Sequence, residues 1–174
     1  KFPDFVIRLS EIEAFTECTS TLTQERRLAA FDQELVLRFF ALKNRRERFK
    51  HEVADFLTEY MEEVAEPGGA AAFDYAGEEA RFRKTFETLQ KTLGEYSFGF
   101  AKRNRKELSA GFGVYHFEAI TIGMQVILDK LNLDDQAHLD KFREVLYQIK
   151  LDSRFISITT GEGKNSPGPL RERI

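Results

Sequence analysis

The sequence contains no tryptophan, a single cysteine and only four prolines among 174 residues. One cysteine, Cys18, can form neither an internal disulfide nor a thiolate metal cage, which suits a reducing compartment, so we expect a cytoplasmic location. The chain also lacks any run of about eighteen apolar residues and any charged-then-apolar amino terminus. We therefore expect neither a membrane span nor a signal peptide.

Neither sign of charge is in large excess, because 26 lysines and arginines face 29 acidic residues, for a net charge of −3. No global field draws such a chain to nucleic acid, so any contact of that kind must come from local basic patches. The length suits one compact helical domain over residues 1–174. Because the chain begins at Lys1 and its final "PLRERI" resembles the opening turn of another helix, we expect a fragment of a longer protein.

Phenylalanine is abundant, with seventeen copies, and its spacing is helical almost throughout. Apolar residues recur at intervals of three and four in six segments, namely residues 3–18, 31–44, 51–64, 78–94, 113–131 and 134–150. The β-branched "FISITT" at 155–160 finds no second strand to pair with, so we interpret it as a helix end or an extended lead into the closing loop. The sequence predicts an all-α protein, an irregular bundle of six to eight helices.

Several residues within these segments carry local expectations. Asp32 is a suitable N-cap for the segment 31–44, which is apolar nearly all round and therefore central. Its one interior charge, Arg38, then needs a partner, because an unpaired buried charge costs several kcal/mol. Gly123 weakens its helix unless a neighbour packs close.

The helix ends and one buried stripe are also predicted. The turn at Pro67–Gly69 ends one helix, Gly94 ends the next, and Asp134 or Asp135 caps the helix at 134–150. We expect the buried stripe of that last helix to consist of five apolar residues, Leu139, Phe142, Val145, Leu146 and Ile149.

The closing "TTGEGKNSPGPLRERI" looks at first like a nucleotide-binding P-loop. That motif needs a glycine five positions before the Gly163-Lys164 pair and a serine or threonine directly after the lysine, and here Ile158 and Asn165 occupy those places. We predict a plain loop followed by a helix that starts at a proline. A weaker alternative stays open, in which an anion binds at this helix amino terminus near Lys164, Ser166, Arg171 and Arg173.

Chemical motifs are otherwise missing. The three histidines are scattered, no Cys-x-x-Cys completes the His116-Phe117-Glu118 sequence as a zinc deaminase centre, and no Gly-x-Ser-x-Gly elbow is present. We expect this segment to hold no metal, no cofactor and no catalytic residue, so that it is not an enzyme by itself.

Two basic clusters are more informative. The first comprises Arg45, Arg46, Arg48 and Lys50, and the second comprises Lys102, Arg103, Arg105 and Lys106. The second precedes a Gly111-Phe112-Gly113 turn that opens a helix, and cations, exposed glycine backbone and a helix amino terminus all suit phosphate.

Four aromatic residues near the second cluster, Phe98, Phe100, Phe112 and Tyr115, could stack on bases. The alternative is that both clusters are solvated faces balanced by neighbouring glutamates, and that the phenylalanines belong to the core.

Three stretches, "RRLAAFDQELVLRFFALKN", "FKHEVADFLTEYMEEV" and "GFGVYHFEAI", together with the closing loop, carry a family resemblance that covers nearly the whole chain. The chain resembles the α-helical half of proteins containing the GmrSD restriction endonuclease N-terminal domain, a ParB-like family. That family implies prokaryotic proteins in which a ParB-like α/β domain with an Asp-Gly-Gln-Gln-Arg signature, linked to nucleotide hydrolysis, precedes such helices. Some members add a histidine-type nuclease domain, and characterised relatives restrict modified or invading phage DNA.

This chain contains neither the signature nor a nuclease motif, so no catalytic residue carries over. The resemblance implies a helical module of a DNA-defence protein that packs on an upstream ParB-like domain and contacts DNA or nucleotide phosphate. The candidate contacts are Lys102, Arg103, Arg105, Lys106, Arg45, Arg46, Lys164 and Arg171. The competing expectation is a structural or oligomerisation bundle that docks through the aromatics between Phe98 and Tyr115, and an independent hydrolase is a third class that we expect to be absent.

Overall fold

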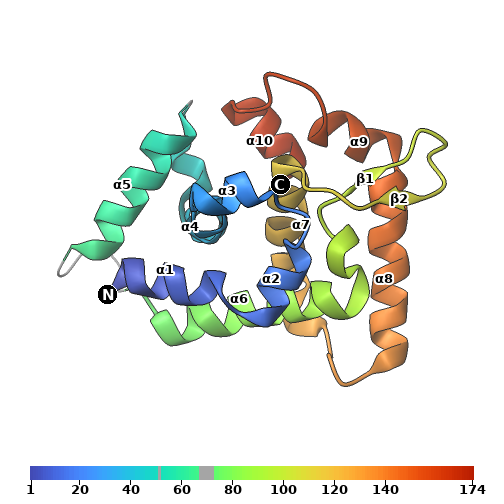
Figure 1. The fold of residues 1–174 in the computed structure, drawn as a ribbon, viewed down its shortest axis with the longest axis horizontal. Helices are drawn as coiled ribbons and strands as arrows, with labels where there is room; N and C mark the ends of the chain where they lie inside the picture. Colours follow the sequence, from blue (N-terminus) through green and yellow to red (C-terminus); the bar gives the residue numbers. More distant parts are fainter. Residues whose placement is uncertain (51, 67–72) are drawn as a thin grey trace.

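The computed structural model describes residues 1–50, 52–66 and 73–174, and within them the chain folds into a helical bundle with one short hairpin (Figure 1). The predicted all-α class is confirmed. Eight of the described α-helices have seven or more residues and two are shorter. The α-helices are α1 (Phe2–Ser10), α2 (Glu13–Cys18), α3 (Gln24–Leu28), α4 (Phe31–Arg45), α5 (Val53–Ala65), α6 (Tyr75–Thr92), α7 (Val114–Gly123), α8 (Gln136–Leu151), α9 (Ser153–Thr159) and α10 (Pro167–Arg173).

Short elements connect these helices. They are the 3-10 turns η1 (Arg46–Arg48), η2 (Gly94–Tyr96), η3 (Met124–Val126) and η4 (Leu128–Lys130), and the strands β1 (Phe100–Ala101) and β2 (Leu108–Ser109). The two strands pair antiparallel, with Phe100 opposite Ser109. None of the described helices combines the length and the apolar character needed to cross a membrane.

The helix α4 lies in the middle of the bundle and packs against α1, α5 and α7 (Figure 1). Its residues Phe39 and Phe40 are fully buried, together with Phe82 and Phe86 of α6. The Phe39 and Phe82 rings meet edge to face, with centroids 5.3 Å apart at 87°. Such pairs contribute about 0.5–1.5 kcal/mol beyond the area that they bury. The helical phenylalanine spacing therefore builds one ring-packed core.

Two predicted helices are broken. Residues 3–18 divide into α1 and α2, because Ile12 adopts an extended conformation. Residues 113–131 remain α-helical only to Gly123 and continue as η3 and η4. Apart from the adjoining helix backbone, no atom of the described residues lies within 4 Å of the position that a Cβ on Gly123 would occupy, so no close neighbour among them compensates for the flexible glycine backbone.

The predicted helix ends are partly right. Asp135 caps α8, its carboxylate accepting a hydrogen bond from the backbone N–H of His138 at 3.1 Å, and Gly94 follows α6 with a φ of +51°. Asp32 is not a cap, because α4 begins one residue earlier, at Phe31. The predicted turn at 67–69 lies outside the described residues.

The segment 155–160 is a helix end, one of the two predicted alternatives, because Phe155–Thr159 form the carboxy-terminal part of a short separate helix, α9. Asp152 caps that helix by accepting hydrogen bonds from the N–H groups of Arg154 and Phe155. The hydroxyl of Thr159 donates to the carbonyl of Phe155, which accommodates a β-branched residue in the helix.

Candidate nucleic-acid interface

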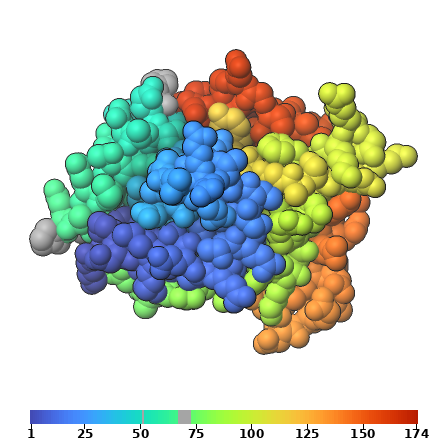
Figure 2. All heavy atoms as spheres, viewed as in Figure 1, coloured from blue at the N-terminus to red at the C-terminus, as the bar shows by residue number. Residues whose placement is uncertain are grey.

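The second basic cluster forms the tip of the β1–β2 hairpin, where Lys102, Arg103, Arg105 and Lys106 are all exposed. In the space-filling view the tip projects from the upper right of the bundle (Figure 2). Arg105 adopts a left-handed conformation with a φ of +53°, which closes the turn. Cations that are adjacent in the sequence are therefore displayed together on a protrusion.

Most of the charge on this hairpin tip is uncompensated. Lys102 binds Glu107 at 2.8 Å, and this hydrogen bond raises the pKa of Lys102 and lowers that of Glu107. Arg103, Arg105 and Lys106 form no ion pair with any described residue. The tip therefore offers three free cations to an anionic partner.

Two contacts fix the position of the hairpin. The hydroxyl of Tyr147 on α8 donates to the carbonyl of Lys106 at 3.2 Å. A Cβ on Gly99 would lie 2.0 Å from the carbonyl oxygen of Ser109, so only glycine permits this approach of the two backbones. These contacts hold the basic tip in a defined position.

In the Gly111-Phe112-Gly113 turn, the N–H of Gly113 is already bonded and is not free for phosphate. The N–H of Gly113 donates to the carbonyl of Phe98 at 2.9 Å. A Cβ on Gly111 or Gly113 would press on the ring of Phe100, at 3.2 and 2.9 Å. These glycines serve the packing of Phe100 instead.

Only one of the four predicted stacking residues is well exposed. Phe98 is fully buried, and Phe112 packs in the core against it, with ring centroids 5.5 Å apart. The guanidinium of Arg173 lies over the ring of Tyr115, with its carbon atom 4.5 Å from the ring centroid. Phe100 alone retains a large exposed fraction, 37%.

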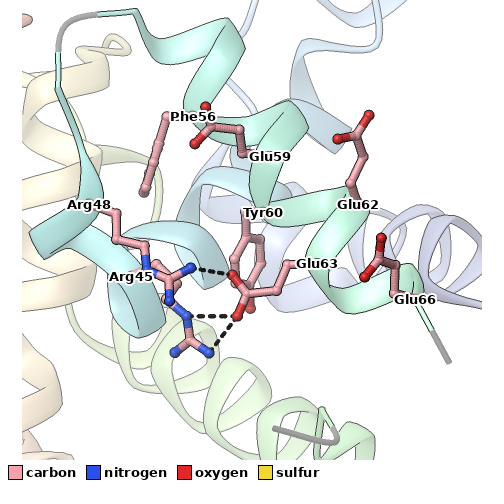
Figure 3. Close-up of a pocket in the computed structure, with 8 residues that line it drawn as sticks. All are labelled: Arg45, Arg48, Phe56, Glu59, Tyr60, Glu62, Glu63 and Glu66. Carbon is pink, nitrogen blue, oxygen red and sulfur yellow. Dashed lines mark hydrogen bonds and ion pairs between the residues drawn. The ribbon is translucent and has the colours of Figure 1, made fainter. Parts of the chain in front are cut away.

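Two residues of the first basic cluster are paired with a carboxylate of α5. Arg45 and Arg48 both bind Glu63, at 2.7 and 2.9 Å (Figure 3). The hydrogen bond from Arg45 is the main reason why the pKa of Glu63 is lowered. Glu59 and Glu62 line the same groove, so a phosphate here would meet an excess of carboxylates.

Arg46 lies instead near Arg171, although the two are 125 positions apart in the sequence. Both line a groove of about 510 Å³ between η1 and α10, together with Phe49, Leu170 and Ile174. The fold thus joins one residue of the first cluster to one residue of the closing segment.

The closing segment is a loop followed by a helix that starts at Pro167, as predicted. Pro167 and Pro169 have no N–H group, and the N–H of Leu170 donates to the carbonyl of Ser166. Only Gly168 then keeps a free N–H in the first turn. The amino terminus of α10 is therefore a poor anion site, and Lys164 beside it is half-buried.

Arg173 is not available to an anion because it belongs to a buried ion network. It binds Glu118 of α7 at 2.7 Å, and Glu118 also binds Arg38 at 2.6 Å. The predicted need of Arg38 for a partner is confirmed, and Glu34 supplies a second carboxylate at 2.7 Å. Burial opposes the charge of Arg38, but both glutamates outweigh this effect and raise its pKa.

Sequence reasoning missed the buried Lys150. Its ammonium group donates to the carbonyls of Ser97 and Gly99, each at 2.9 Å, and lies 3.3 Å from Nδ1 of His116. Burial lowers the pKa of Lys150 to about 7. Burial, followed by the charge of Lys150, lowers the pKa of His116 to about 3.

The periodicity did contain a signal for Lys150, because it continues the buried series Leu139, Phe142 and Leu146 of α8. Val145 and Ile149, which were predicted to belong to the buried stripe, are 48% and 41% exposed. The buried face of α8 is therefore rotated relative to the predicted one.

The described residues include no group of three or more histidine, cysteine or acidic side chains that could hold a metal ion. The structure thus defines a helical bundle whose chemically distinctive surface is a basic hairpin. Comparisons with protein-family models, with curated proteins and with solved structures found no significant match.

Proposed function

We propose that this chain is the helical module of a prokaryotic DNA-defence protein of the kind that it resembles, and that its hairpin tip contacts nucleic-acid phosphate. The observation that carries the proposal is the set of exposed cations Arg103, Arg105 and Lys106, none of which is paired with a described carboxylate. Nucleotide hydrolysis and DNA cleavage would belong to other domains, including an upstream ParB-like domain on which these helices pack.

The distribution of charge over the molecule supports an approach to DNA with the hairpin first. The hairpin and α5 lie at opposite sides of the bundle (Figure 1), and α5 carries Asp55, Glu59, Glu62 and Glu63 without a lysine or arginine. With a net charge of −3, the molecule would approach DNA through its local basic end, with the acidic end turned away.

The test is binding of a labelled DNA duplex at low salt by the wild-type chain and by the double variant Arg103→Ala/Arg105→Ala. Loss of two phosphate contacts should weaken binding by about tenfold or more. Arg154→Ala is the matched control, because Arg154 is an exposed arginine of α9 without a described ion-pair partner. An absence of binding to both duplex and single-stranded DNA, or equal affinities of the double variant and the wild type, would contradict the proposal.

A second candidate is an oligomerisation bundle without nucleic-acid contact. It is favoured by the exposed apolar residues Val145 and Ile149 on α8. In an antiparallel pair of α8 helices from two copies, Val145 would face Ile149, and Lys141 would approach Asp152 of the other copy. Sedimentation separates the two candidates, since a dimer that ignores DNA supports oligomerisation and a monomer that binds DNA supports contact.

A further inference from the structure

A pocket of about 310 Å³ lies directly beside the hairpin, between η2, β2 and α8. Its lining includes the two tyrosines Tyr96 and Tyr147 and the cations Lys102 and Arg143. Sites for small molecules have volumes of about 300–1,000 Å³, so this pocket suits a small group rather than a large ligand.

The two tyrosine rings suit a planar partner. Tyr96 is 40% exposed, and Tyr147 is half-buried, with its hydroxyl held by the carbonyl of Lys106. A ring that is already fixed loses little conformational freedom when a ligand stacks on it. Aromatic side chains stack on every kind of base, because each base has a π-face.

The charges around the rings favour an anion that extends beyond the pocket. Arg143 of α8 is exposed and has no described ion-pair partner. The one carboxylate in the lining, Glu107, is bound to Lys102, so its charge is compensated. From this pocket the hairpin continues to Arg103 and Arg105, so the pocket lies beside the exposed cations of the hairpin tip.

We infer that this tyrosine pocket receives an unpaired base of a single-stranded nucleic acid whose phosphates lie along the hairpin tip. The inference rests on the proposed function and adds a ligand class to it. A duplex keeps its bases stacked inside, where neither tyrosine can reach a base face, whereas a single strand presents both its bases and its phosphates. The pocket would therefore make the surface prefer single strands.

The experiment compares a labelled oligothymidylate with a DNA hairpin duplex that has the same number of phosphates, at one salt concentration. The wild-type chain should bind the single strand more tightly. Tyr96→Leu should weaken single-strand binding by about tenfold and leave duplex binding unchanged, because a stacked base is lost. Tyr96→Phe, which keeps the ring, is the matched control and should bind like the wild type.

Two further variants separate the possible outcomes. Tyr147→Phe removes the hydrogen bond to Lys106 but retains the ring, so it should retain most single-strand binding, whereas Arg103→Ala/Arg105→Ala should weaken both DNAs. If both DNAs bind but Tyr96→Leu changes neither affinity, or changes both equally, the pocket assignment is overturned and the phosphate contact stands. If the wild-type chain binds neither DNA, the proposed function fails and the pocket assignment fails with it.

Discussion

Lys150 allows a sharp test of the core, because its ammonium group is buried without an ion pair to any described residue. The groups that face it are the carbonyls of Ser97 and Gly99, the imidazole of His116 on α7 and the ring of Phe155 on α9. The perturbation is Lys150→Met, which keeps an unbranched side chain and removes the titrating group.

The pH dependence follows from the pKa of Lys150, which burial lowers from its ordinary value of 10.5 to about 7. Between these values the unfolded chain holds the proton and the folded chain does not, so stability rises with pH across this window. Below pH 7 both states are protonated and the penalty is complete. The pKa difference between the folded and unfolded states corresponds to about 5 kcal/mol of unfolding free energy. About 2 kcal/mol of this change occurs between pH 7 and 9.

The assay is denaturant unfolding at pH 7, 8 and 9, which gives the free energy of unfolding of both proteins. The upper limit is pH 9 because burial raises the pKa of Tyr60 above its usual 10, and this effect lowers stability at higher pH. The wild-type free energy should rise by about 2 kcal/mol relative to that of Lys150→Met over this range. Parallel pH profiles would refute the reasoning and show that Lys150 stays protonated in the folded state.

Three further substitutions test other parts of the account. Glu118→Gln leaves two buried arginines without their shared carboxylate and should lower the free energy of unfolding by about 3–5 kcal/mol in denaturant titrations; a loss below about 1 kcal/mol would contradict the network. Gly99→Ala would place a Cβ 2.0 Å from the carbonyl oxygen of Ser109, so amide hydrogen exchange in the hairpin should accelerate, and unchanged exchange would argue against the close approach. The hydrogen bond from Arg8 is the main reason why the pKa of Glu79 is lowered to about 2. The stability advantage of the wild type over Glu79→Gln should therefore be present above about pH 4.5 and should disappear as the pH falls towards 2. An advantage that does not change with pH would contradict this.

The sequence was informative where one helix face is clearly apolar. The helices α5, α6 and α8 overlap their predicted segments, with ends shifted by one to three residues, because their apolar residues repeat at helical intervals. Gly123 was predicted to weaken the helix at 113–131, but not to end it. Whether a glycine ends a helix depends on what packs beside it, and the local sequence does not contain that information.

The charged residues show a different limit. The need of Arg38 for a partner follows from its apolar helix, but Glu118 lies 80 positions away, and no local pattern connects them. From the sequence, Arg45 and Arg48 are candidates for phosphate contact like the hairpin cations. In the fold both pair with Glu63 of α5. A run of charged residues such as Lys102–Lys106 is expected at the surface from its composition alone. That Arg103, Arg105 and Lys106 have no described carboxylate partner depends on the tertiary structure.

The salt dependence of DNA affinity tests the central claim most directly. If Arg103, Arg105 and Lys106 each bind a phosphate, the slope of log affinity against log salt for duplex DNA should be about −3, and Arg103→Ala/Arg105→Ala should reduce it to about −1. A slope near zero for the wild type, or the same slope for both proteins, would contradict the assignment of the hairpin tip as the phosphate contact.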